Sequence, residues 1–191
     1  TQFWSDHGLS QTEVAYARGL SQGLALPTIE AGLTHSKVRV IGLVVDAIEK
    51  IMHGMTLGTA GMHNQVRQWV AEGFLTSLLD LLLDHGYAVF LTSDHGNIEC
   101  VGRGRPSEGA VADLRGERVR VYPDPALRAQ VQARFPDALA WPALGLPENY
   151  FSLLAPGGFA FVKEGVRIVG HGSITLEELI VPFIRIERRG P

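Results

Sequence analysis

The stretch YAVFLTSDHGN (residues 87–97) decides the fold class that we predict for this chain. Residues 87–93 form a continuous apolar and β-branched run, which is typical of a buried β-strand. The run ends in a polar turn that carries Asp94 and His95. In open α/β sheets ligands bind outside the carboxyl ends of the strands, so an acid and an imidazole here indicate a functional site. A second Asp-His-Gly at residues 6–8 follows no apolar strand, and we interpret it as a coincidence.

The residues before this turn predict a repeating strand and helix pattern. KVRVIGLVVD (37–46) is a second β-branched run, and a helical rhythm continues after it through AIEKIMHG (47–54). Apolar residues then recur at helical spacing over 60–85, where Gly86 provides a stop. Strand, helix and strand joined by short connections form a βαβ crossover. We therefore expect an α/β fold with a mainly parallel sheet flanked by helices. A further helix, broken near Pro27, is predicted over residues 11–33.

The second half of the chain has a different character. Residues 100–158 are rich in arginine and proline and predict an irregular insertion. FAFVKEGVRIV (159–169) resembles a small hairpin that turns at Glu164-Gly165. A short helix and a last strand are expected after it, and Thr175 and Glu178 have the spacing of a capping box for that helix.

The composition is that of a globular protein, with 46% hydrophobic and 19% charged residues. A length of 191 residues predicts a single domain over 1–191, and the opening TQFWSDHG suggests the C-terminal part of a longer protein. The net charge of −3 gives no general attraction to nucleic acid or membranes. The one cysteine excludes an internal disulfide framework. The first residues do not have the basic and apolar pattern of a signal sequence, and no apolar run is long enough to predict a membrane span. These features predict a cytoplasmic location.

Six acid and histidine side chains lie at or near predicted strand ends. The candidate metal ligands are Asp46, Glu49, His53, Asp94, His95 and His171. Carboxylates and imidazoles without thiolates suit zinc or manganese. Each residue also has a structural interpretation, because Asp94 could cap a turn, Glu49 could face solvent, and the histidines could bond to backbone. The set taken together favours a metal site.

Four segments carry a resemblance to a known family. They are IEKIMHGMTLGTAGMH (48–63), TSDHGNIE (92–99), YFSLLAPGGFAFV (150–162) and GHGSITLEELIVPFIRIE (170–187). The Asp-His-Gly signature is similar to that of the alkaline phosphatase superfamily. The four segments together resemble the PglZ domain, a branch of that superfamily found in BREX phage-defence systems.

The resemblance implies a site for two divalent metals, zinc most readily or manganese. It implies that Asp94 and His95 bind one metal, and that His53 and His171 bind the other. Relatives pair the residue matching His53 with an aspartate four positions earlier, where this chain has Glu49. Asp46 is therefore a rival ligand, since the extra methylene of Glu49 moves its carboxylate.

The implied activity is that of a metal-dependent phosphoesterase acting on a phosphate ester or nucleotide, with other phage-defence proteins as partners. The early Asp and Ser/Thr nucleophile of the superfamily have no recognisable counterpart before residue 37, so we expect the isolated chain to be inactive as a fragment. The alternative is a non-catalytic regulatory or scaffolding domain. Arg103 and Arg105 are candidates for binding phosphate. Binding of nucleic acid through the arginine-rich loop is a third hypothesis, and it predicts strong salt dependence.

Overall fold

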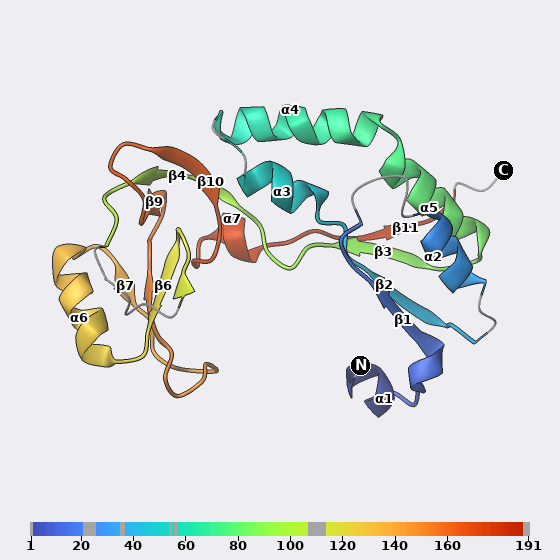
Figure 1. Ribbon diagram of the computed structural model, residues 1–191, viewed down its shortest axis with the longest axis horizontal. Coiled ribbons are helices and arrows are strands. Elements are labelled where there is room, and N and C mark those ends of the chain that lie inside the picture. The colour runs from blue at the N-terminus through green and yellow to red at the C-terminus, as the bar shows by residue number, and fades with distance from the viewer. Residues whose placement is uncertain are drawn as a thin grey trace. The chain divides into compact units, whose positions relative to one another are not determined.

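Figure 1 shows the computed structural model of the chain, which describes residues 2–20, 26–34, 37–53, 55, 57–106 and 114–188. The backbone forms two compact units. Unit 1 holds the described parts of 1–51, 63–91 and 184–191, and unit 2 holds those of 52–62 and 92–183. The elements wholly or mainly in unit 1 are α1 (Gln2–Asp6), a 3₁₀ turn (Gln11–Glu13), β1 (Val14–Ala17), α2 (Leu26–Leu33), β2 (Val40–Leu43), α3 (Ala47–His53), α4 (Gly58–Ala71), α5 (Phe74–Asp84), β3 (Val89–Thr92) and β11 (Phe183–Ile186).

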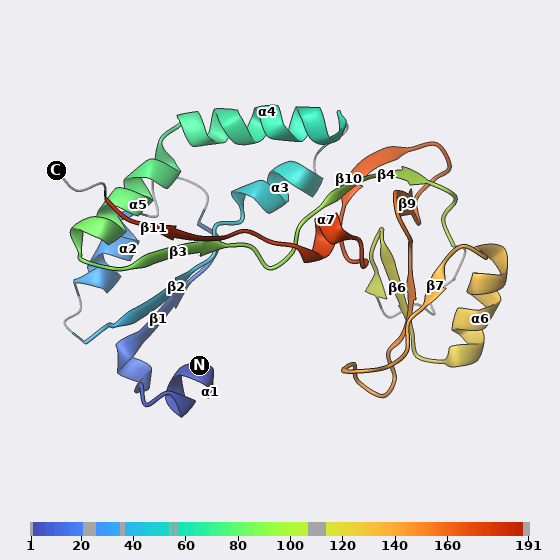
Figure 2. The ribbon, with the colours of Figure 1, turned by 180° about the vertical axis from the view of Figure 1, so that it is seen from behind.

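Unit 1 is built from two short strand pairs and the helices around them. β1 and β2 run parallel, with Val14 opposite Val40, and α2 is the crossover that connects them. β3 pairs with β11 (Figure 2). Helix α5 buries Phe74, Leu78 and Leu82, which are spaced by four residues and so share one face. These side chains form the core of the unit together with Leu20, Ile29, Leu33, Ala47, Trp69 and Val89.

Unit 2 contains two further sheets. Its elements are β4 (Ile98–Gly102), β5 (Leu114–Arg115), β6 (Val119–Tyr122), α6 (Pro125–Arg134), β7 (Leu139–Ala140), β8 (Phe151–Leu154), β9 (Phe159–Ala160), β10 (Arg167–Gly170) and α7 (Leu176–Leu179). One sheet has the order β5-β6-β8-β7, and the other has the order β10-β4-β9. The core of the unit is formed by Tyr122, Phe135, Ala138, Leu153, Ala155, Phe159 and Phe161. Helix α6 covers the four-stranded sheet.

The prediction of an α/β protein agrees with this structure, but the prediction of a mainly parallel sheet is wrong. β1–β2 and β4–β9 are parallel, whereas β10–β4 and every neighbouring pair in the four-stranded sheet are antiparallel. The strands β2 and β3 were expected to share one sheet, yet they pair with β1 and β11 respectively. The local patterns therefore indicated β2 and β3 correctly as strands and their partners wrongly.

Two helix predictions also need correction. Part of the segment expected to be a helix over 11–33 is strand β1, and the helical part is α2, with Pro27 in its first turn. Proline is tolerated there because the first N–H groups of a helix have no intrahelical partner. The helix expected over 60–85 is two helices, α4 and α5. Gly73 lies between them with φ 86°, a left-handed conformation that glycine adopts without strain.

The segment around residues 100–158 is more regular than expected. It holds β5 to β8 and helix α6, although its place as an insertion within a single domain stays a prediction. The hairpin expected over 159–169 is wrong, because β9 and β10 do not pair with each other. Strand β4 lies between them, parallel to β9 and antiparallel to β10. The turn itself is present, since the N–H of Val166 donates to the carbonyl of Lys163 at 3.1 Å.

Candidate metal centre

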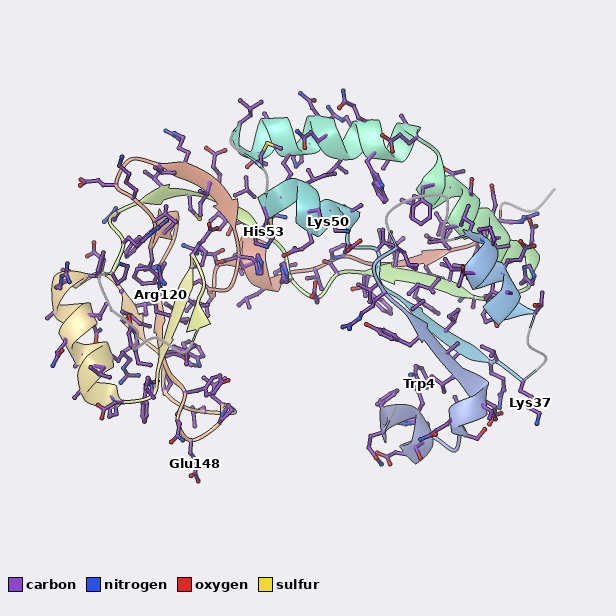
Figure 3. The ribbon with its side chains drawn as sticks, in the orientation of Figure 1. Trp4, Lys37, Lys50, His53, Arg120 and Glu148 are labelled. Carbon is purple, nitrogen blue, oxygen red and sulfur yellow. The ribbon has the colours of Figure 1, made fainter. Side chains whose placement is uncertain are left out.

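Helix α3 places two of the candidate ligands one turn apart. Strand β2 ends at Leu43, and the helix begins at Ala47, directly after Asp46, so its first turn holds Glu49. His53 follows four residues later at the helix end and is labelled in Figure 3. Residues four apart lie on the same helix face. The sequence spacing alone therefore indicated this pair correctly.

The third member of the cluster is His171, which follows strand β10. Glu49, His53 and His171 each offer one ligand atom, and these atoms all lie within 4.8 Å of one another. The ring centroids of His53 and His171 are 5.7 Å apart. Gly172 has φ 108°, a backbone conformation that residues other than glycine rarely adopt, so the loop turns sharply just after His171. A carboxylate and two imidazoles form a donor set that fits zinc or manganese.

His95 lies directly against this cluster, in the polar turn after β3. Its ring stacks on that of His171, with centroids 3.7 Å apart and ring planes at 6°. The Nδ1 of His95 donates a hydrogen bond to the carbonyl of Gly96 at 2.8 Å, because a carbonyl oxygen can only accept. The lone pair of the neutral ring is then on Nε2, which lies 3.7 Å from Oδ1 of Asp94. The structure thus brings His95 and Asp94 beside the cluster.

Asp46 is not part of the cluster. Its Oδ2 forms an ion pair with Nζ of Lys50 at 2.7 Å, again at the spacing of one helix turn. Its Oδ1 is buried and has no hydrogen-bond partner among the described residues. Glu49 therefore lies in the cluster and Asp46 does not, and which of the two binds a metal stays a prediction.

The two arginines expected to bind phosphate have exposed side chains. Arg103 forms an ion pair with Asp137 at 2.8 Å, and its guanidinium lies 5.7 Å from the centre of the Phe159 ring. Arg105 is exposed. Their role in phosphate binding stays a prediction.

The arginine run also contains two residues that the sequence did not single out. Arg118 is completely buried, and Arg120, labelled in Figure 3, is 5% exposed. Arg118 forms a two-pronged ion pair with Glu178, with Nε donating to Oε1 at 2.9 Å and the second terminal nitrogen to Oε2 at 2.7 Å. A run of arginines among glycines is usually a surface loop, so the signal for burial was weak.

The fold and the donor set together define an α/β protein with a carboxylate and histidine site suited to a divalent cation. The family model described as the BREX system PglZ alkaline phosphatase-like domain matches residues 2–186, nearly the whole chain. The chain therefore belongs to the PglZ family, as its motifs indicated. A comparison with curated proteins finds no match. In the described part of the chain, no helix has the length and apolarity needed to cross a membrane.

Proposed function

We propose that this chain forms the metal-binding core of a phosphoesterase-type site acting in phage defence. The observation that carries the proposal is the clustering of Glu49, His53 and His171 within 4.8 Å. In this proposal these three residues hold one divalent cation, zinc most readily or manganese. Such a cation, when bound, acts as a Lewis acid toward a phosphoryl oxygen.

Asp94 and His95 are proposed to bind a second cation. An imidazole lone pair and a carboxylate oxygen are both acceptors, so they do not attract each other without a cation or proton between them. Zinc binds nitrogen and oxygen ligands at about 2.0–2.2 Å, and the 3.7 Å between Nε2 of His95 and Oδ1 of Asp94 leaves room for such an ion. The hydrogen bond from Nδ1 to Gly96 supports this role, because it fixes the ring and leaves Nε2 as the ligand atom.

The substrate class, the defence partners and the cytoplasmic location belong to the same proposal and are supported by the family assignment. A phosphate ester or nucleotide is the proposed substrate. Arg103 and Arg105 are proposed to contribute to phosphate binding, although Arg103 would first have to leave Asp137.

One observation favours a second candidate function, a regulatory or scaffolding domain that keeps the metal site without turnover. The superfamily resemblance implies an aspartate at the end of an early strand and a Ser or Thr nucleophile at a helix start. Of the residues before 37 that the structure describes, only β1 is a strand, and it ends at Ala17 and is followed by Arg18 and Gly19. The Glu49 position, where relatives have aspartate, points the same way.

Zinc and manganese titrations test the proposal directly. The purified chain is loaded with Zn²⁺ or Mn²⁺, and its affinity is compared with that of the variants His53→Ala and His171→Ala. Loss of an outer-shell partner lowers metal affinity by roughly 10–100-fold, and loss of a ligand is expected to exceed this. His63→Ala is the matched control, since His63 is exposed on helix α4 and is not in the cluster.

Two further variants and one assay complete the test. Glu49→Gln is expected to weaken binding more than Asp46→Asn, because only Glu49 is in the cluster. Hydrolysis of bis-p-nitrophenyl phosphate by the loaded protein would support the enzyme over the second candidate. Equal affinity in the wild type, His53→Ala and His171→Ala would refute the site.

A further inference from the structure

A single buried residue, Glu178, joins the two loops that carry His171 and His95. It is 2% exposed, and its partner Arg118 is 0% exposed. Besides the two bonds to Glu178, Arg118 donates to the carbonyl of Phe159. The guanidinium is thereby held by strand β9 as well as by helix α7. All these residues belong to unit 2.

The carboxylate of Glu178 also accepts hydrogen bonds from the backbone of the loop that follows His171. Oε1 accepts from the N–H of Ser173 at 3.0 Å. Oε2 accepts from the N–H of Thr175 at 3.2 Å and from its hydroxyl at 2.9 Å. The hydroxyl of Ser173, two residues after His171, donates to the carbonyl of Ala155 at 2.7 Å. The backbone that follows His171 is therefore held by contacts with a charged buried residue.

The backbone of Glu178 contacts the other loop. Its carbonyl accepts from the N–H of Gly96 at 2.8 Å. Gly96 is the residue whose own carbonyl orients the His95 ring. A Cβ at Gly96 would lie 1.9 Å from the carbonyl oxygen of Glu177. The backbones of the loop and of α7 are therefore so close at this point that only glycine fits.

This arrangement is not explained by stability alone. A buried ion pair is often no more stabilising than apolar side chains of similar volume, because both charges must be removed from water. What the pair adds here is directional, because five donors from Arg118, Ser173 and Thr175 converge on one carboxylate and hold the loop after His171. The same residue bonds the other loop through its backbone carbonyl, which accepts from Gly96. The stacked rings of His95 and His171 sit on those two loops.

We propose that Arg118 and Glu178 are positioning residues that hold His171 and His95 in the geometry of the metal centre. The proposal rests on the proposed function in that it assigns a role toward the metal. The chemistry is that of an outer-shell support, which orients ligands without contacting the cation.

The test compares Glu178→Gln with Glu177→Gln. Glutamine keeps the size of Glu178 but replaces one carboxylate oxygen by an amide NH₂. The N–H and O–H groups that donate to that oxygen in the wild type then face another donor. Glu177 is the adjacent exposed residue, and its substitution removes the same charge. We expect Glu178→Gln to lower the Zn²⁺ affinity by about 10–100-fold. Glu177→Gln should leave it within about 2-fold, and circular dichroism should show both variants folded.

A second readout needs no metal. The stacked rings of His95 and His171 shift each other's proton resonances in the NMR spectrum of the metal-free protein. In Glu178→Gln these resonances should move toward those of the exposed His63, and in Glu177→Gln they should stay. If the wild type binds no Zn²⁺, the proposed function fails, and this NMR comparison still decides the positioning role.

A folded Glu178→Gln variant with unchanged Zn²⁺ affinity and unchanged histidine resonances would overturn the proposal. If that variant does not fold, Thr175→Val decides, because it removes one donor from Oε2 and leaves the buried charges paired. We then expect a several-fold loss of Zn²⁺ affinity and faster amide exchange at Gly172 and Ser173. No change in either quantity would overturn the proposal.

Discussion

Replacing Gly96 by alanine gives a sharp test of the contact between the His95 loop and helix α7. A Cβ built on Gly96 meets the carbonyl oxygen of Glu177 at 1.9 Å and the carbonyl carbon at 3.0 Å. Both are backbone atoms, so no side-chain rotation can relieve the contact. Either the loop or the start of α7 has to move.

The expected cost has two parts. Inserting a methyl group where there is no space typically costs 1–3 kcal/mol. The movement also lengthens the hydrogen bond from Gly96 to Glu178, which measures 2.8 Å, and a bond of this kind contributes about 0.5–1.5 kcal/mol. We therefore expect Gly96→Ala to lower the free energy of unfolding by about 2–4 kcal/mol.

Urea unfolding followed by circular dichroism measures this change, with Gly158→Ala as the control. Gly158 lies in the same unit, and the nearest atom to its added Cβ is the carbonyl oxygen of Glu99 at 3.5 Å, an ordinary contact distance. Its substitution should change the free energy of unfolding by less than about 0.5 kcal/mol. If the two variants are equally stable, the close approach of Gly96 to α7 is wrong.

Two groups in unit 2 give further predictions. Burial raises the pKa of Glu178, but hydrogen bonds from Arg118, Ser173 and Thr175 outweigh burial and hold that pKa below its ordinary value of 4.5. A carboxylate with a lowered folded-state pKa stabilises the protein above the unfolded value and loses this contribution as the pH falls through the folded value. Thermal unfolding between pH 7 and pH 3 should show a loss of stability below about pH 4.5 that Glu178→Gln lacks. Burial raises the pKa of the Cys100 thiol to about 11, so at pH 8 only roughly one thiol in a thousand is ionised. A thiol reagent such as Ellman's should label Cys100 only as the protein unfolds, and rapid labelling of the native protein would contradict its burial.

The features that the sequence predicted correctly depend on residues close together in the chain. The spacing of Glu49 and His53 on helix α3 is one example. The capping box of Thr175 and Glu178 is another, since the N–H of Thr175 donates to Oε2 of Glu178 at 3.2 Å. In each case the interacting groups are three or four residues apart, a distance at which helix geometry determines what meets.

Strand pairing was predicted badly because it depends on contacts between distant segments. Residues 159–169 have the pattern of a hairpin, yet β4, which ends at Gly102, inserts between the two strands. A strand pattern states which residues extend and which face is apolar, and it does not identify the neighbouring strand. The same limit explains why β2 was assigned to a sheet with β3 instead of with β1.

The candidate site shows the same division between local and distant contacts. Asp94 and His95 could be singled out because they follow an apolar strand, whereas the stacking of His95 on His171 joins loops far apart in the chain. Arg118 was missed for a further reason. Its sequence neighbours are Glu117 and Val119 in a run that resembles a solvated loop, and its partner Glu178 is 60 residues away.

A buried arginine requires an acid of matching geometry, and only the fold shows whether one is within reach. The sequence around Glu178, the acid partner of Arg118, nevertheless gave some indication of the ion pair. Glu178 has capping-box spacing from Thr175, which holds its carboxylate against the backbone, and in the fold its side chain is buried. A carboxylate in such surroundings needs a cation, because an unpaired buried charge is costly. Searching the chain for that cation is the step that would have drawn attention to the arginines of residues 103–120 as structural partners.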